Sequence, residues 1–91
     1  MVQRTRLYRL KVTEQEAIKI VEHNREILQI DSEMEFESAE RAIVEYKEDR
    51  EMPGMAQDRI AWVVTLSCQM GFVEVQIDDK TGNILWVRRS A

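Results

Sequence analysis

The fold is decided by the stretch FVEVQIDDKTGNILWV, residues 72–87 of a chain of 91 residues. Both ends of this stretch are rich in β-branched and aromatic residues, as strands are. Between them, Asp79 can bond to its own backbone at the first position of a turn, and Gly82 can adopt the left-handed conformation at the last. We therefore predict a hairpin with strands over 72–77 and 84–87, closed by a type I turn and a glycine bulge.

A helix is predicted nearer the start of the chain, beginning at Thr13. Thr13 and Glu16 have the spacing of a capping box, in which the hydroxyl accepts from the Glu16 amide and the carboxylate reaches back to the Thr13 amide. From Ala17 onward, apolar residues recur at three- and four-residue spacing along one side, interrupted by Asn24. This pattern predicts a helix that ends near Ile30, where polar residues begin.

The middle of the chain allows two interpretations. Ser32 and Glu35 form a second possible capping box, which would start a helix that runs to Glu48. Against that, residues alternate around Ala42, Val44 and Tyr46, which favours a strand. We prefer the strand and predict, in order, a strand over 41–47, a loop over 48–58 and a strand over 59–67.

These elements predict an α+β fold, in which one N-terminal helix packs on one face of a three- or four-stranded antiparallel sheet. Alternation over 4–12 predicts a further short strand at a sheet edge or before the helix. The strands follow one another as a meander, because neighbouring elements in sequence usually pair. Residues 1–91 are expected to form a single domain.

The C-terminal hairpin has two partly apolar faces, and one helix can cover only one of them. With the turn closed at Gly82, Ile77 lies opposite Leu85 and Val75 opposite Val87, and these residues face the helix. Sheets are built in covered layers, so the other face needs a cover, either a segment of this chain or, as we prefer, a partner or second subunit. The candidate partner-binding residues on that face are Ile84, Trp86, Arg88, Val63 and Ile43.

Two segments of the chain resemble the PepSY domain family. After an apolar strand that contains Trp62, residues 73–85 (VEVQIDDKTGNIL) are similar to the family's closing hairpin, V-x-V-D-x-x-T-G-x-I/V-L. Near the start, residues 11–20 (KVTEQEAIKI) look like its helix opening, L-T-x-E-E-A-I-x-I-A, with Val12 where Leu is usual. The resemblance implies the same α+β meander and a small regulatory module, in a family associated with peptidase propeptides and proposed to restrain peptidases.

The sequence offers no positive support for catalysis, for a metal or for a cofactor. Cys68 is the single cysteine and His23 the single histidine, so we expect a buried structural thiol rather than a catalytic pair. Asp78 and Asp79 do not fit a calcium loop and are expected to serve the turn, pointing to opposite faces. No metal-ligand spacing or phosphate-binding loop is present, so we expect neither an enzyme nor a bound cofactor.

Charge and hydropathy exclude two classes of partner and point to a third. The net charge of −4 argues against nucleic acid as the main partner. No apolar run is long enough to span a membrane, so we expect no membrane insertion and a cytoplasmic location, unless the chain is an excised domain of an exported protein. Residues 31–51 hold nine acidic and three basic residues, which either solvate a face or steer a basic partner.

Two functions follow as hypotheses. The first is a non-catalytic protein-interaction or regulatory module, which restrains a peptidase if the PepSY resemblance extends to function. Such a module could bind through the sheet face around Trp86, or by adding a partner strand to an exposed edge over 4–12 or 41–47. The alternative is a self-associating structural protein, a homodimer that buries Trp86 and Ile84 against their own copies.

Overall fold

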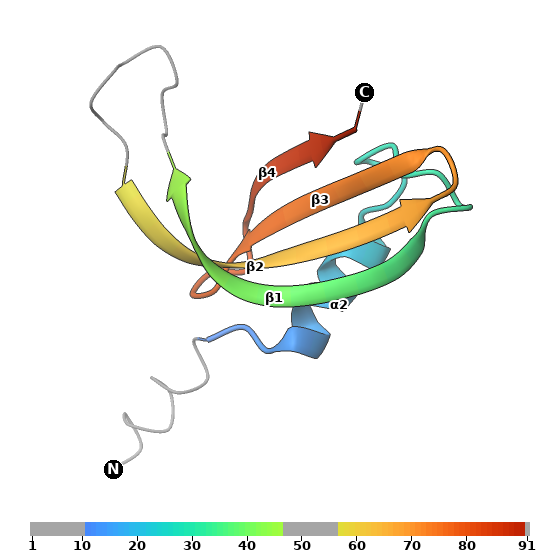
Figure 1. The fold of residues 1–91 in the computed structure, drawn as a ribbon. Helices are drawn as coiled ribbons and strands as arrows, with labels where there is room; N and C mark the ends of the chain where they lie inside the picture. The colour runs from blue at the N-terminus through green and yellow to red at the C-terminus, as the bar shows by residue number, and fades with distance from the viewer. Residues whose placement is uncertain (1–10, 47–56, 91) are drawn as a thin grey trace.

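The computed structural model describes residues 11–46 and 57–90, which form one helix and a four-stranded sheet (Figure 1). The elements are α2 (Glu14–His23), β1 (Glu35–Tyr46), β2 (Gln57–Cys68), β3 (Gly71–Asp78) and β4 (Ile84–Arg89). The strands lie side by side in the order β1-β2-β3-β4, and each is antiparallel to its neighbour. The predicted α+β fold, with a helix on one face of an antiparallel sheet, is confirmed.

Helix α2 begins as predicted and ends earlier. The Glu16 amide donates to the Thr13 hydroxyl at 3.2 Å and the Thr13 amide donates to the Glu16 carboxylate at 3.1 Å, so the capping box is complete. The predicted end near Ile30 is wrong, since α2 ends at His23. The helix stops there because the Asn24 side chain donates to the Ile20 carbonyl at 2.6 Å. That carbonyl is the acceptor that the Asn24 amide would use in a continuing helix.

Strand β1 decides between the two interpretations of the middle of the chain. It starts at Glu35, before the predicted start at Arg41, and the alternative helix from Ser32 is wrong. Arg25, which follows α2, donates to the main-chain carbonyl of Met34 at 2.8 Å and so holds the connection that leads into β1.

Some predicted segments fall partly outside the described residues. Of the first predicted strand, over 4–12, only Lys11 and Val12 are described, and neither belongs to a strand. The end of the predicted strand at Lys47 and most of the predicted loop also lie outside. Strand β2 starts at Gln57, two residues before its predicted start at Arg59. Residues 57 and 58, which were predicted to end the loop, therefore belong to the strand.

The hairpin of β3 and β4 forms as predicted, with a different register next to its turn. Val75 pairs with Val87 as expected, but Ile77 pairs with Ile84 and not with Leu85. Leu85 is therefore the extra residue of a β-bulge, where two residues of one strand oppose one of its partner.

Asp78, rather than Asp79, closes the turn of this hairpin. Its Oδ1 accepts from the amides of Lys80 at 2.7 Å and Thr81 at 3.3 Å. Its carbonyl accepts from the amide of Gly82 at 2.9 Å. Gly82 has a φ of 78°, which is the left-handed conformation that the sequence predicted for it.

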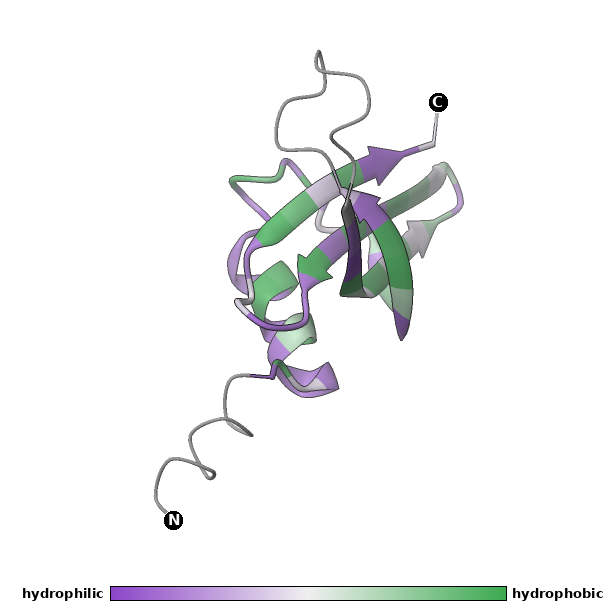
Figure 2. Cartoon of the chain, turned by 90° about the vertical axis from the view of Figure 1, so that its left-hand side faces the viewer, coloured by the Kyte–Doolittle hydropathy of each residue, from purple (hydrophilic) through white to green (hydrophobic). Residues whose placement is uncertain are grey.

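The core lies between α2 and the face of the sheet that the helix covers. Trp62 is 9% exposed and belongs to this core, as predicted. Figure 2 shows hydrophobic positions on the helix and on the strands beside it. The buried apolar side chains that pack together are Val12, Ala17, Val21, Ile30, Trp62, Val64, Leu66, Val73, Val75 and Ile77.

Candidate partner-binding surface

None of the described segments covers the face of the sheet that is turned away from α2. In Figure 1, α2 lies below the sheet, and the ends of β1 and β2 next to residues 47–56 bend upward, so this second face is concave. We call it the outer face. The register of the strands places two cross-strand rows of side chains on the outer face. One row consists of Glu40, Val63, Gln76 and Trp86, and the next consists of Ser38, Thr65, Glu74 and Arg88.

Three of the five predicted partner-binding residues lie on the outer face. Val63 is half-buried, and Trp86 in the same row is 38% exposed. Arg88 lies in the next row, with its guanidinium 3.5 Å from the Glu74 carboxylate and 5.6 Å from the centroid of the Phe72 ring. The outer face therefore combines two partly exposed apolar side chains, Val63 and Trp86, with a partly exposed ion pair, the mixture that is common at protein interfaces.

Ile84 does not lie on the outer face, so its predicted placement is wrong. It pairs with Ile77 and packs against the buried core on the helix side of the sheet. The cause is the bulge at Leu85, which reverses the side to which Ile84 points relative to a regular strand.

Ile43 also lies on the helix side, contrary to prediction, although it is not buried. It pairs with Ile60, in the row next to the pair of Arg41 and Trp62. The Ile43 side chain is 74% exposed and that of Ile60 is 54% exposed. The two isoleucines thus form a small apolar patch on the helix side of the sheet, away from Trp86.

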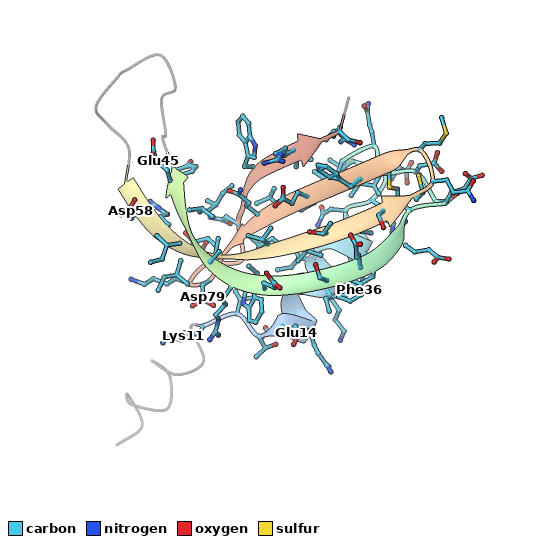
Figure 3. All side chains as sticks on the ribbon, in the orientation of Figure 1. Lys11, Glu14, Phe36, Glu45, Asp58 and Asp79 are labelled. Carbon is cyan, nitrogen blue, oxygen red and sulfur yellow. The ribbon has the colours of Figure 1, made fainter. Side chains whose placement is uncertain are left out.

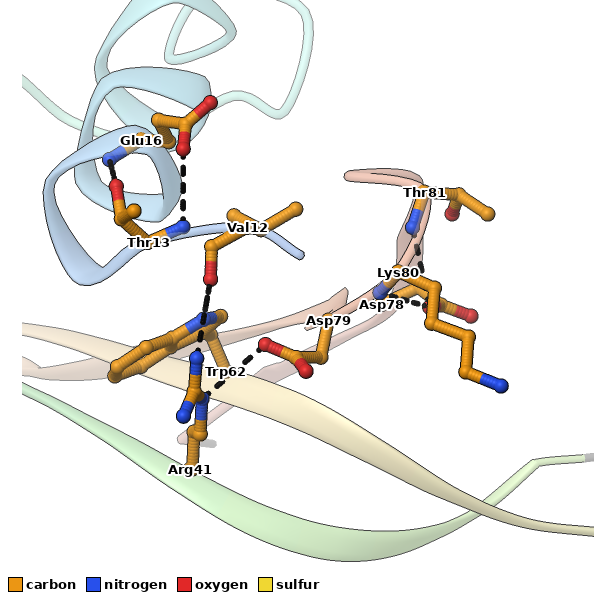
Figure 4. Close-up of polar contacts among 9 residues, drawn as sticks. All are labelled: Val12, Thr13, Glu16, Arg41, Trp62, Asp78, Asp79, Lys80 and Thr81. Carbon is orange, nitrogen blue, oxygen red and sulfur yellow. Dashed lines mark hydrogen bonds and ion pairs between the residues drawn. The ribbon is translucent and has the colours of Figure 1, made fainter. Parts of the chain in front are cut away.

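A charged cluster around the β3–β4 turn was not predicted from the sequence. Asp78 and Asp79 are both 4% exposed, and each is paired with an arginine. Arg59 donates to Oδ2 of Asp78 at 2.8 Å. Arg41 donates to Oδ1 of Asp79 at 3.2 Å, as Figure 4 shows. Asp78 is the last residue of β3 and Asp79 the first of the turn, and their arginine partners Arg59 and Arg41 lie on opposite faces of the sheet. The two carboxylates therefore turn to opposite faces, as predicted.

The same cluster fastens the segment before α2 to the sheet through Val12. The indole nitrogen of Trp62 donates to the Val12 carbonyl at 2.8 Å, and Arg41 donates to it at 3.4 Å. The Val12 amide donates to the Asp79 carbonyl at 2.6 Å. Arg41 also lies over the Trp62 ring, 4.7 Å from its centroid. These contacts give Arg41, Trp62 and Asp79 a structural role.

The environment of Asp78 changes the acid–base behaviour of its carboxyl group. Burial raises the pKa of Asp78, but hydrogen bonds from the Lys80 amide, the Arg59 guanidinium and the Thr81 amide outweigh burial. The pKa of Asp78 therefore lies below its ordinary value of 3.8. The carboxylate is charged in the folded protein under all but acidic conditions.

We expect this lowered pKa to make the protein less stable in acid. The ionised Asp78 stabilises the fold at pH values above 3.8, and this stabilisation is lost as the pH falls below 3.8 and through the pKa of the folded state. The variant Asp78→Asn carries no charge at this position, so its free energy of unfolding should fall less steeply with acid. Urea unfolding across a pH series measures both slopes, and equal slopes below 3.8 would contradict the assignment.

Two open hollows lie on the surface of the described residues, one beside the β3–β4 turn and one beside the β2–β3 turn. One, of about 550 Å³, is lined by Lys11, Asp58, Arg59, Ile60, Asp78, Asp79 and Lys80. The other, of about 380 Å³, is lined by Glu33, Glu35, Ser67, Cys68, Gln69 and Met70. Cys68 is half-buried rather than buried as expected, and its sulfur accepts from the Met70 amide at 3.3 Å. His23 lines neither hollow.

Among residues 11–46 and 57–90, no three histidine, cysteine or acidic side chains gather in a way that could hold a metal ion. Within the same residues, no helix has the length and apolar character to cross a membrane.

Comparisons with protein-family models, with curated proteins and with solved structures gave no match. The PepSY resemblance therefore remains a hypothesis that rests on the residues from which it was drawn.

Proposed function

We propose that this protein is a non-catalytic interaction module that binds a partner protein through the outer face of its sheet. The observation that carries the proposal is the partly exposed row of Val63, Gln76 and Trp86 on a concave surface. A large aromatic side chain that is 38% exposed on the edge strand β4 supplies apolar area that a partner can bury.

The polar residues around this row support a protein partner of mixed character. Glu74 and Arg88 form a partly exposed ion pair beside Trp86, and such pairs contribute orientation and specificity at the rim of an interface more than affinity. Glu40 and Thr65 add further polar groups on the same face. A partner that places an apolar side chain against Trp86 and polar groups around it fits this surface.

The PepSY resemblance supports a more specific form of the proposal, in which the partner is a peptidase that the module restrains. Within this form, the outer face contacts the peptidase and the module itself carries out no chemistry. Inhibition of purified peptidases by the isolated chain tests this form, and a complete lack of effect would leave only the general interaction role.

The substitution Trp86→Asp tests the outer face directly. We expect it to abolish partner capture, because it replaces an exposed aromatic anchor with a charge that the interface must desolvate. The measurement is a pull-down with wild-type and variant chains, followed by titration of the purified partner. The matched control is Ile27→Asp, because Ile27 is 80% exposed in the turn after α2 and does not lie on the outer face.

Light scattering over a concentration series decides whether the partner is a second copy of this chain. A wild-type dimer that becomes a folded monomer on Trp86→Asp would identify the homodimer. Equal capture of a partner by wild-type and Trp86→Asp, with Ile27→Asp also unchanged, would contradict the outer face as the binding surface.

A further inference from the structure

The free edge of β1 is the longest unpaired strand edge in the described part of the sheet. β1 and β4 are the two edge strands, and β4 has six residues whereas β1 has twelve. From Ser38 to Tyr46, β1 pairs with β2 without a register shift, so its backbone is regular over this stretch. A long regular edge presents a row of N–H and C=O groups to which another strand can pair.

The side chains along β1 give this edge a negative charge that no residue in the described parts of the chain neutralises. Four exposed glutamates lie on the strand, and no described residue forms an ion pair with any of them. The glutamates are Glu35, Glu37, Glu40 and Glu45. The one arginine of β1, Arg41, is paired with Asp79 at 3.2 Å and turns its guanidinium over Trp62. Figure 3 shows Phe36 and Glu45 near the two ends of the strand.

The same edge carries an exposed apolar side chain. Ile43 is 74% exposed and lies on the helix side of the sheet. Along β1, its neighbours on the same side are Arg41 and Glu45. A strand added beside β1 would place one of its own side chains next to Ile43 and reduce the exposure of this side chain. The edge therefore offers backbone pairing, apolar contact and acidic groups together.

We propose that β1 accepts an added strand from an extended segment of a partner protein that is rich in Lys or Arg and places an apolar residue against Ile43. The proposal rests on the interaction role proposed above and adds a second binding surface, separate from the outer face. A second copy of this chain fits the edge poorly, because pairing of β1 with β1 brings the glutamates of both copies together. A basic segment makes opposite-charge pairs in their place.

The test uses the full chain and a synthetic peptide of alternating Lys and Val, capped at both ends and as long as the stretch from Ser38 to Tyr46. We expect binding that weakens with added salt and that slows amide hydrogen exchange in β1. Reversal of two charges in Glu40→Lys with Glu45→Lys should weaken the affinity about tenfold or more, because the lysines of the peptide then approach an edge that carries two positive charges in place of two negative ones. The matched control is Glu26→Lys, an exposed glutamate in the turn after α2.

A second peptide separates strand addition from general attraction between opposite charges. Its sequence is the same, but every backbone nitrogen is methylated, so neither of its edges can donate hydrogen bonds to the carbonyls of β1. Equal binding of both peptides, or equal binding by the wild-type chain and the double variant, overturns the proposal. Protection of β1 that depends on the concentration of the chain alone, without peptide, assigns the edge to a second copy and also overturns it.

The variant Trp86→Asp separates this proposal from the proposed function. It should leave peptide binding unchanged, because Trp86 lies on the outer face and not at the β1 edge. Peptide binding that is lost in Trp86→Asp but kept in the double variant would support the outer face and overturn the edge. Failure of Trp86→Asp to affect partner capture bears on the proposed function alone.

Discussion

Replacement of Asp78 by alanine is expected to lower the free energy of unfolding by about 2–3 kcal/mol. The carboxylate is 4% exposed and accepts hydrogen bonds from Arg59, Lys80 and Thr81, so alanine leaves all three donors without this acceptor. Arg59 is 33% exposed, and water can therefore hydrate part of its charge after the substitution, which keeps the loss below that of a fully buried pair. Denaturant unfolding followed by circular dichroism measures the difference.

Asp58→Ala is the matched control for this prediction. Asp58 is an exposed aspartate one residue before Arg59 and lines the same hollow, but no described residue forms an ion pair with it. Its replacement should change the free energy of unfolding by no more than about 0.5 kcal/mol. If Asp78→Ala and Asp58→Ala cost the same, the turn is not held by the Asp78 carboxylate.

The second large effect is expected from Leu66→Ala, which should lower the free energy of unfolding by about 3 kcal/mol. Leu66 is fully buried in the layer between the sheet and α2, so the smaller side chain removes apolar contacts and leaves a cavity. In a domain of this size that is a large share of the total stability, and thermal unfolding should show a clearly lower midpoint.

Ile60→Ala provides the comparison for Leu66→Ala on the same strand and the same face of the sheet. Ile60 is 54% exposed, so it loses much less apolar burial when truncated, and its replacement should cost less than about 1 kcal/mol. A similar loss in both variants would mean that the patch of Ile43 and Ile60 is covered in solution. It would also contradict the exposure on which the β1 edge proposal depends.

The parts of the fold that depend on local sequence were predictable. The capping box at Thr13 needs only residues three apart, and the left-handed Gly82 needs only its own backbone freedom. Both are found where the sequence placed them. The strand of Trp62 was also recognisable, because a run that is apolar on both sides is typical of a central strand.

The errors have a common cause, which is that a single residue or a distant contact overrides a regular pattern. One bulge at Leu85 moves Ile84 to the helix side, and periodicity alone carries no information about where an extra residue will be tolerated. The Asn24 side chain ends α2 at a position where the apolar spacing continues. The ion pairs of Asp78 and Asp79 join residues far apart in sequence, so no local pattern predicts them.

The candidate binding surface was predicted in part for the same reasons. Val63, Trp86 and Arg88 lie in regular stretches of β2 and β4, where alternation identifies the face correctly. The face of Ile43 depends on the register between β1 and β2 across a long connection, which the sequence does not specify.

The attachment of Val12 to the sheet has a practical consequence for handling this protein. Val12 is bonded to Trp62 and Asp79 on the side where α2 packs, and Figure 3 places Lys11 on that side as well. A dye or surface linker attached at Lys11 therefore lies on the side of the sheet opposite Trp86. Immobilised in this orientation on a sensor chip, the molecule presents its concave surface to the flowing solution.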